Sequence, residues 1–488
     1  MAYRTTLVRE PAVAGAFYPA DPGALQEMVD RLLAEAPRYE TEPAALIVPH
    51  AGYIYSGHVA AWGFRQLEGR PYDAVVVLGT NHVEPFFHEI SVWARGAWRT
   101  PLGEIPIDEE LADALLAAGP PLRFVPEVHL EEHSIEVELP FLQRLFPGLR
   151  FVPVMIGEPS PENIEALAEA LARALAGRRA IVIASSDLSH YPRDEHAHQV
   201  DLSAIGAILS LDEELLRHTI AEWMARRIPG LATLMCGEGP VRTAMAYARR
   251  TGAVHTTLLR YANSSDVPYG RKDHVVGYAA IRFAREPDPP LGAEDRRTLL
   301  EIAREAVNHA VQGRPLPELS VSSPALQLPR ACFVTLTRGG RLRGCRGEVW
   351  PRSDLAHAVQ RVAVLSALDD PRFPPVTVEE LPHLEYEISV LSPLRPVADP
   401  EEIVIGRDGL FILAGGRTGL LLPQVPVEQG WDREAFLRAI CLKAGLPEDA
   451  WRWPEARLFR FEAEVFGESI GSALRRGGAI PASSALAG

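Results

Sequence analysis

Three apolar runs of the chain are each followed within a few residues by side chains that bind metals or transfer protons. These side chains are His50, His82 and the pair Asp187 and His190. Short apolar runs bounded by turn residues are typical of buried parallel strands. Open α/β sheets place their ligands at the carboxyl ends of such strands. We therefore expect the three strand ends to meet around one site.

His50, His82 and Cys236 form a donor set that suits a transition metal. Two neutral imidazoles and one anionic ligand leave positions open on Fe(II), Zn(II) or Cu. Cys236 precedes an expected helix, whose N-terminus would favour the thiolate, as would a metal. Asp187 is expected to orient an imidazole, and His190 to act as a general acid or base or to contact substrate. The alternative is that each histidine is a hydrogen-bonded packing residue.

The segment His129-Leu-Glu-Glu-His133 matches the H-x-x-E-H pattern of inverted zinc proteases. That motif needs a helix that already includes His129, whereas the two glutamates are more typical of a helix start. We expect instead a helix over residues 131–146, kinked or broken at Pro140. His133 would then lie at the helix N-terminus and could join the site.

Composition restricts the class of protein. The chain has 488 residues, so two or three domains are expected, and 47% hydrophobic with 23% charged residues is typical of soluble globular proteins. No apolar run approaches the roughly 20 residues of a membrane span, and no signal-peptide pattern opens the chain, which predicts a cytoplasmic protein. A net charge of −15 disfavours nucleic acid and anionic membranes as partners. The four cysteines are not paired in CxxC motifs, so free or ligand thiols are expected.

The elements that would position these residues alternate between strand and helix up to residue 284, which predicts a three-layer α/β domain. Expected helices cover 22–36, 57–67, 109–118, 162–176, 194–210, 212–226 and 240–250. Besides the three runs above, strands are expected at 150–157, 253–262 and 275–283, the last two as an antiparallel edge. Three prolines and a glycine at 285–292 predict a linker.

After the linker the pattern predicts an α+β domain over 293–474, followed by a flexible tail at 475–488 that is rich in Gly, Ala and Ser. Expected helices cover 294–311, 353–368 and 432–444. Expected strands are 331–336, 341–349, 384–392, 403–406, 409–414, 418–422 and 457–466.

The segment from Gly339 to Gly347 could bind an anion, because glycines and arginines such as Arg343 surround Cys345. Nearby positive charge would lower the pKa of the Cys345 thiol. The alternative, which the chemistry favours slightly, is a tight hairpin with solvated arginines, since no base is visibly paired with the thiol.

Several motifs in order resemble the MEMO family over about residues 5–284. They are Pro49-His-Ala-Gly-Tyr-Ile-Tyr-Ser-Gly57, Leu78-Gly-Thr-Asn-His82, Glu132-His-Ser-Ile-Glu-Val-Glu-Leu-Pro-Phe141, Ser185-Ser-Asp-Leu-Ser-His190 and Cys236-Gly. That family resembles the LigB-like class III extradiol dioxygenases, whose non-haem iron is held by two histidines and a glutamate. The resemblance implies His50 and His82 as ligands and Cys236 in place of the glutamate. It also implies that Asp187, His190 and His133 line the cavity. The softer thiolate admits Cu or Zn beside Fe(II) and puts ring cleavage in doubt.

Residues 293–470 resemble the AMMECR1 family, through the glycine-rich segment, Asp370-Pro-Arg-Phe-Pro-Pro375 and Gly430-Trp-Asp-Arg-Glu-Ala-Phe-Leu437. Arg346 stands where that family has isoleucine, which weakens any site inferred there. MEMO-like and AMMECR1-like modules resemble two parts of the three-part AmmeMemoRadiSam system, whose third member is a radical-SAM enzyme. This chain lacks a CxxxCxxC motif, so that partner would be a separate protein. The implied function is redox or dioxygenase-like chemistry on a small molecule or a partner. The alternative is a binding module for a peptide or small anion.

Overall fold

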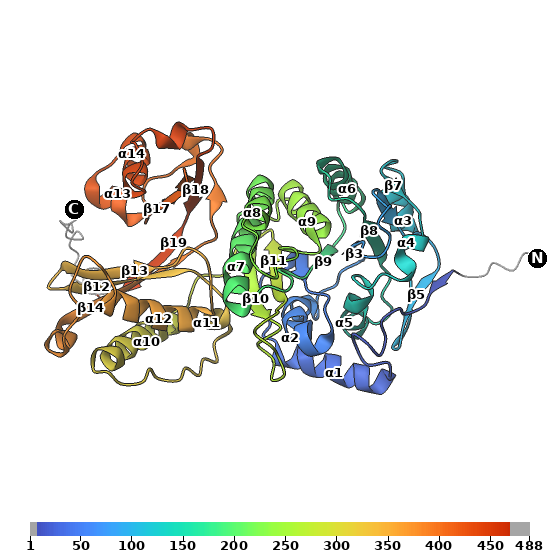
Figure 1. The fold of residues 1–488 in the computed structure, drawn as a ribbon, viewed down its shortest axis with the longest axis horizontal. Helices are drawn as coiled ribbons and strands as arrows, with labels where there is room; N and C mark the ends of the chain where they lie inside the picture. Colours follow the sequence, from blue (N-terminus) through green and yellow to red (C-terminus); the bar gives the residue numbers. More distant parts are fainter. Residues whose placement is uncertain (1–6, 469–488) are drawn as a thin grey trace, which may run out of the picture. The chain divides into compact units, whose positions relative to one another are not determined.

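The computed structural model describes residues 7–468, and the chain divides into two compact units at the bond between Pro289 and Pro290. Figure 1 shows the element order, and each unit is described by itself. The tail expected at 475–488 lies outside the described residues. Within the described part of the chain, no helix is long and apolar enough to cross a membrane.

An eight-stranded mixed sheet is the centre of the first unit. Its strand order is β10 (His255–Asn263), β11 (Gly277–Ala284), β2 (Pro43–Val48), β9 (Ala180–Ser185), β3 (Ala74–Thr80), β8 (Val152–Ile156), β4 (Ile90–Val92) and β7 (Leu122–Arg123). The strands β2, β9, β3 and β8 are parallel neighbours, and β10 and β11 form the antiparallel edge that the sequence predicts. A smaller sheet joins β1 (Val8–Arg9), β5 (Ala97–Thr100) and β6 (Gly103–Pro106).

The register of the parallel strands brings three carboxyl ends to one edge of the sheet. Val48 of β2 pairs with Ser185 of β9, and Leu78 of β3 pairs with Ala184 of β9. All residues of β2 are buried, and so are nearly all of β3 and β9, because helices cover both faces. The segments that follow the three strands therefore start side by side, as the sequence predicts.

Helices form the two outer layers. Helices α6 and α9 cover one face of the sheet, and α1, α2 and α5 cover the other (Figure 1). The helices of this unit are α1 (Pro22–Glu35), α2 (Tyr53–Phe64), α3 (Glu109–Leu116), α4 (Glu127–Leu130), α5 (Leu139–Leu145), α6 (Pro161–Ala174), α7 (Asp194–Ser210), α8 (Glu213–Ala225) and α9 (Glu238–Arg250). Local sequence fixes several starts: Asp21 caps α1 and Ser160 caps α6, each followed by a proline in the first turn. The fold is a three-layer α/β domain.

The helix predicted over residues 131–146 is wrong. The chain instead forms α4, an irregular turn, the 3-10 segment Glu136–Glu138 and then α5. Pro140 stands in the first turn of α5, where its missing N–H costs no hydrogen bond, so it belongs to a new helix start and not to a kink. The helix predicted from residue 57 begins earlier, at Tyr53 directly after Gly52.

The second unit is α+β, with two four-stranded antiparallel sheets. The first sheet has the order β13 (Arg341–Gly347), β12 (Cys332–Arg338), β14 (Leu384–Leu391) and β19 (Ala463–Gly467). The second has the order β15 (Arg395–Pro396), β18 (Arg457–Phe461), β16 (Gly409–Ala414) and β17 (Arg417–Leu421). Its helices are α10 (Ala293–Val311), α11 (Pro324–Gln327), α12 (Leu355–Leu368), α13 (Gln424–Gln429) and α14 (Arg433–Lys443).

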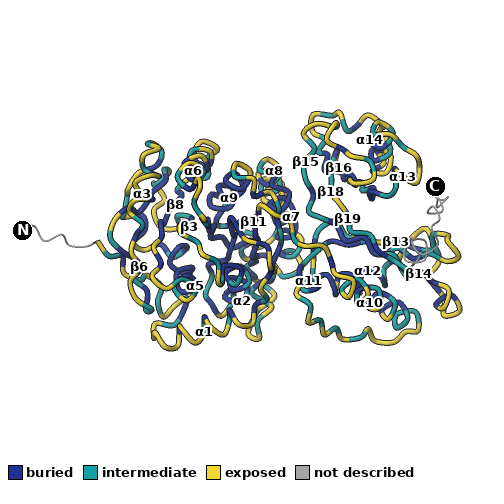
Figure 2. The backbone as a smooth tube through the Cα atoms, turned by 180° about the vertical axis from the view of Figure 1, so that it is seen from behind, coloured by how far each residue is buried: buried dark blue, intermediate teal, exposed yellow. Residues whose placement is uncertain are grey.

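Each sheet of the second unit has its own hydrophobic core (Figure 2). Helices α10 and α12 pack on the first sheet, and α14 packs on the second. Two predictions fail here. The expected strand 457–466 is two strands, β18 and β19, which belong to different sheets. The expected strand at 403–406 does not form, and β15 lies earlier in the chain.

Candidate metal centre

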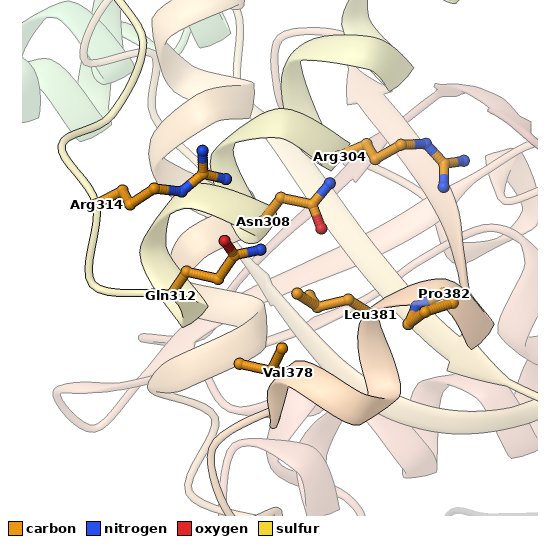
Figure 3. Close-up of a pocket in the computed structure, with 7 residues that line it drawn as sticks. All are labelled: Arg304, Asn308, Gln312, Arg314, Val378, Leu381 and Pro382. Atoms are coloured by element: carbon orange, nitrogen blue, oxygen red, sulfur yellow. The ribbon is translucent and has the colours of Figure 1, made fainter.

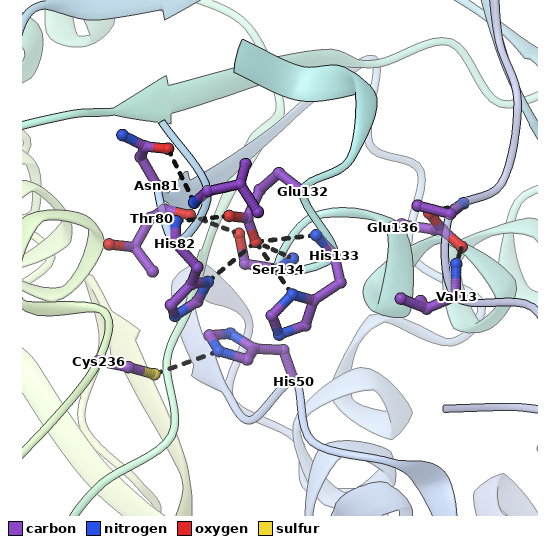
Figure 4. Close-up of polar contacts among 12 residues, drawn as sticks. Val13, His50, Thr80, Asn81, His82, Glu132, His133, Ser134, Glu136 and Cys236 are labelled. Atoms are coloured by element: carbon purple, nitrogen blue, oxygen red, sulfur yellow. Dashed lines mark hydrogen bonds and ion pairs between the residues drawn. The ribbon is translucent and has the colours of Figure 1, made fainter. Parts of the chain in front are cut away.

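His50 follows β2, and its ring faces the sulfur of Cys236 (Figure 4). The side chain is almost completely buried. Ring atom Nδ1 lies 2.7 Å from Ser185 Oγ, and Nε2 lies 3.2 Å from Cys236 Sγ. Burial, together with the neighbouring histidines, lowers the pKa of His50 well below its ordinary value. His50 is therefore a neutral imidazole, the form that binds metals.

His82 follows β3 and is held by the carboxylate of Glu132. The backbone N–H of His82 donates to Glu132 Oε2 at 2.6 Å, and the ring Nδ1 lies 3.0 Å from Oε1 (Figure 4). The ring centroids of His82 and His50 are 5.4 Å apart. An imidazole whose Nδ1 meets a carboxylate leaves Nε2 for a metal, which is the usual arrangement behind metal-binding histidines.

His133 stacks on His82, with centroids 4.8 Å apart, and its other face meets Phe17 at 4.8 Å. Glu132 accepts from the backbone N–H groups of His133 and Ser134 at 2.8 and 2.9 Å. Burial raises the pKa of Glu132, but its hydrogen bonds with His82 outweigh burial and hold the pKa at about 2. One ionised carboxylate thus orients two histidines of the site.

Cys236 precedes α9, which begins two residues later at Glu238. Its Sγ lies 3.8 Å from the backbone oxygen of Asp187, besides its contact with His50. The expected lowering of its pKa is wrong for the protein without metal, because burial and the Asp187 charge raise the pKa of the thiol well above its ordinary value. Loss of the thiol proton therefore depends on a cation beside the sulfur.

Asp187 does not orient an imidazole, contrary to the prediction. Its Oδ1 accepts from the backbone N–H groups of His50 and Ala51, at 2.9 and 3.3 Å. Burial raises the pKa of Asp187 to about 7. The carboxyl group therefore fixes the backbone after β2, while the imidazole of His50 meets Ser185 instead.

His190 lies beside this cluster. Its Nδ1 is 2.9 Å from the backbone oxygen of Leu188, so Nδ1 carries the hydrogen and Nε2 carries the lone pair. Burial lowers the pKa of His190, with a smaller contribution from His82. A neutral imidazole with a free Nε2 can accept a proton.

Two groups of possible ligand atoms share His50. One contains His50, His82 and His133, and the other contains His50, Asp187 and Cys236, with the ligand atoms of each group within 4.8 Å of one another. Together they contain both imidazoles and the thiol that the sequence predicts. Imidazole and thiol donors suit iron, zinc and copper and not magnesium or calcium, so the residues fit a transition metal.

The inverted zinc-protease motif does not form. Helix α4 ends at Leu130, before His133. His129 is completely buried, and its Nε2 lies 2.9 Å from Ser91 Oγ. His129 therefore packs in the core and does not join either ligand group.

Sequence reasoning missed the roles of Glu132 and Ser185. The sequence pattern places Glu132 in the H-x-x-E-H match and at a helix start, whereas in the structure its carboxylate orients His82 and His133. Ser185 ends β9, and its position beside His50 depends on the register of β2 and β9, which the sequence does not reveal.

In the second unit, Cys345 and Arg343 both form hydrogen bonds with other residues of the same unit. The backbone N–H of Cys345 donates to Asp370 Oδ2 at 2.8 Å, and Thr335 Oγ1 donates to its sulfur at 3.4 Å. Burial raises the pKa of the Cys345 thiol and outweighs the lowering by Arg372, so the expected net lowering is wrong. Arg343 forms two hydrogen bonds to the carboxylate of Glu380, at 2.8 and 2.9 Å. The predicted hairpin forms between β12 and β13, but Arg343 is not solvated.

A hollow of about 430 Å³ lies elsewhere in this unit, between α10 and the 3-10 segment Val378–His383 (Figure 3). Arg304, Asn308 and Gln312 line it from α10. It includes neither Cys345 nor Arg343, so it is separate from the glycine-rich hairpin.

Comparison with known proteins follows the division into two units. Residues 9–282 match the Memo-like protein family, and residues 300–466 match AMMECR1. A MEMO1 family protein of Methanothermobacter thermautotrophicus is 38% identical over 273 residues, which cover 54% of this chain and 95% of that protein. One from Sulfolobus acidocaldarius is 37% identical over 277 residues, covering 53% of this chain and 94% of that protein.

Among solved structures, an uncharacterized protein of Pyrococcus horikoshii is 42% identical, with a TM-score of 0.34, and the match covers 35% of this chain and 89% of that one. Across residues 9–282 the chain belongs to the family of Memo-like proteins, and an AMMECR1 domain follows at residues 300–466.

Proposed function

We propose that the first unit binds one divalent transition metal through His50, His82 and Cys236 and carries out redox or dioxygenase-like chemistry there. The observation that carries this proposal is that His50 belongs to two ligand groups which together contain the three donors. Fe(II) is the first candidate, with Cu and Zn as rivals, because imidazole and thiolate ligands suit all three. His133 is a further candidate ligand, or it lines the substrate cavity.

The surrounding residues would orient the metal-binding histidines and accept a proton from the substrate. A bound metal would polarise substrate oxygens and support electron transfer. Glu132 keeps the Nδ1 atoms of His82 and His133 occupied, so their Nε2 atoms face the site. His190, neutral and with a free Nε2, is placed to take a proton from a substrate hydroxyl group. Asp187 fixes the backbone of His50.

Metal analysis of the purified protein tests the centre. We expect about one transition metal per chain in the parent protein, and a marked loss in Cys236→Ala, because a thiolate ligand is removed. Cys345→Ala is the matched control, since Cys345 is also partly exposed and lies in the other unit. Equal metal content in the parent protein and Cys236→Ala would rule out the thiol as a ligand.

Activity is tested separately, by anaerobic reconstitution with Fe(II), Cu or Zn followed by oxygen uptake on a panel of catechols and other small phenols. Oxygen uptake by the parent protein that is lost when His190 is replaced supports the proposed oxidoreductase activity. Metal binding without turnover of any compound would contradict it.

The second candidate is a binding module that recognises a peptide or small anion in the same cavity. The contact between Cys236 Sγ and His50 Nε2 favours it, because the two groups satisfy each other without an ion. Protein that holds no stoichiometric metal would support this candidate over the first.

We further propose that the chain acts in the cytoplasm on a small molecule or protein partner, together with a separate radical-SAM enzyme of an AmmeMemoRadiSam system. Support comes from the union of the two family domains in one chain. The acidic net charge disfavours nucleic acid and membrane surfaces as partners. Co-purification of the chain with a radical-SAM enzyme from the same cells would support this partnership, and its absence from the purified complex would contradict it.

A further inference from the structure

The hydroxyl group of Ser185 lies among three polar groups behind the metal centre. Its Oγ is 2.7 Å from His50 Nδ1, 2.6 Å from the backbone oxygen of Ser134 and 2.8 Å from Glu138 Oε1. Ser185 and Glu138 are both completely buried. A hydroxyl group has one hydrogen and two lone pairs, so these three contacts fill its hydrogen-bonding capacity.

Counting hydrogens decides which group donates. The Ser134 carbonyl oxygen can only accept, so at 2.6 Å it takes the hydroxyl hydrogen of Ser185. A hydrogen given to Ser134 cannot also be given to His50. The Nδ1 atom of His50 must therefore donate, and its Nε2, which faces Cys236, carries the lone pair.

The third partner of the Ser185 hydroxyl group is Glu138, at the end of the 3-10 segment Glu136–Glu138. Its Oε2 is buried without a hydrogen-bond partner among the described residues, and no cation neutralises the carboxyl group. A charged carboxylate in that position would be costly, and burial raises the pKa of Glu138 well above its ordinary value. The neutral acid carries a hydrogen on Oε1, which donates to the second lone pair of Ser185.

We propose that Ser185, held by Glu138 and the Ser134 carbonyl group, is a positioning residue that fixes His50 in the tautomer with Nδ1 protonated and Nε2 free. This inference deepens the proposed function, because it rests on His50 as a metal ligand. The Nδ1 atom of His82 is held by the ionised carboxylate of Glu132. The Nδ1 atom of His50 is held by a neutral pair, the Ser185 hydroxyl group and the Glu138 acid behind it. The two imidazoles therefore differ in basicity.

Two measurements on five variants test the proposal. The first is the long-range ¹H–¹⁵N spectrum of the histidine-labelled protein without metal, with the His50 signals assigned by their absence in His50→Asn. We expect a protonated Nδ1 in the parent protein and loss of that signature in Ser185→Ala. Glu138→Gln retains it, because an amide N–H can donate to Ser185 Oγ as the neutral acid does. Glu138→Leu also retains it, because the Ser134 carbonyl oxygen still takes the Ser185 hydrogen.

The second measurement is Co²⁺ affinity, followed by the absorption of the thiolate–cobalt bond. We expect Ser185→Ala to bind Co²⁺ about 10–100-fold more weakly, with Glu138→Gln close to the parent protein. Ser210→Ala is the control, because Ser210 is a buried serine whose hydroxyl group donates to the Ala207 carbonyl oxygen and accepts from the Asp212 N–H, and neither partner belongs to the candidate site. Thermal unfolding confirms that each variant is folded.

The outcomes separate the two proposals. If the parent protein shows a protonated Nδ1 on His50 but binds no Co²⁺, this inference holds and the proposed metal centre is wrong. An unchanged His50 signature in Ser185→Ala overturns the inference, even if Co²⁺ binds. If Ser185→Ala does not fold, a hydrogen on Nε2 instead of Nδ1 in the parent protein, or loss of the Nδ1 signature in Glu138→Gln, overturns it.

Discussion

At the scale of single residues, the site depends on groups that fill the Nδ1 positions of its histidines. Glu132 meets His82, Ser185 meets His50, and a backbone oxygen meets His190. Each of these contacts leaves the ring's lone pair on Nε2. A set of imidazoles that is oriented before a ligand arrives loses less entropy on binding it.

Asp370 in the second unit gives a prediction at the same scale. Its carboxylate accepts from the backbone N–H of Cys345 and pairs with Arg372 at 2.7 Å. Burial raises the pKa of Asp370, but Arg372 outweighs burial and holds the pKa at about 2. Because the folded-state pKa lies below the ordinary value near 4, this group adds stability above pH 4, and that stability is lost as the pH falls towards 2.

We expect Asp370→Asn to lower the free energy of unfolding of the second unit by about 1–3 kcal/mol at pH 7. The gap between the variant and the parent protein should close at pH 2–3, and urea unfolding at several pH values measures it. Asp369→Asn is the control, because Asp369 is exposed and lies 3.9 Å from Arg346. A gap that stays constant with pH would contradict the assignment.

At the scale of elements, strand order and register create the site, and close packing holds its parts together. Gly79 of β3 lies against the turn that carries Glu132 and His133. A Cβ atom at Gly79 would lie 2.5 Å from Ile135 Cγ1 and 2.7 Å from Ser134 Oγ. The turn therefore packs directly on the strand that ends in His82.

Gly79→Ala should push this turn away from β3. We expect a loss of about 1–3 kcal/mol in stability, and weaker metal binding because Glu132 moves relative to His82. Urea unfolding and Co²⁺ titration measure the two effects. Gly23→Ala is the control, because its Cβ would approach only the side chain of Asp21 in the first turn of α1. Tighter or unchanged metal binding in Gly79→Ala would show that the turn does not position the site.

The sequence predicted the elements best where a pattern is local. Buried strands that end in His50, His82 and Asp187 were recognised because apolar runs and turn residues lie together in the chain. The segment 131–146 failed because Pro140 fits a helix start as well as a kink. The prediction of a single strand over 457–466 failed because apolar residues continue through this segment. In the structure, Glu462 separates two strands that belong to different sheets. Hydrogen-bond partners such as Ser185 depend on register between distant strands, which no local pattern reveals.

At the scale of the whole molecule, the chain between the two units is anchored on both sides. Asp288 accepts from Thr41 Oγ1 at 2.9 Å and from Thr257 Oγ1 at 2.6 Å, and it pairs with the buried Arg282. On the other side, the backbone N–H of Leu291 donates to Glu464 at 2.9 Å. Only Pro289 and Pro290 lie between these anchors, and proline fixes its own φ angle.

Asp288→Ala should release the first anchor. We expect residues 285–292 to resist limited proteolysis in the parent protein and to be cut in the variant, because cleavage needs a segment that can leave its contacts. The first unit should also lose about 1–3 kcal/mol of stability, since Arg282 remains buried without its carboxylate. Glu286→Ala is the matched control, because Glu286 is an exposed acid of the same segment. Equal cleavage of the parent protein and Asp288→Ala would show that the anchor at Asp288 does not hold the connection.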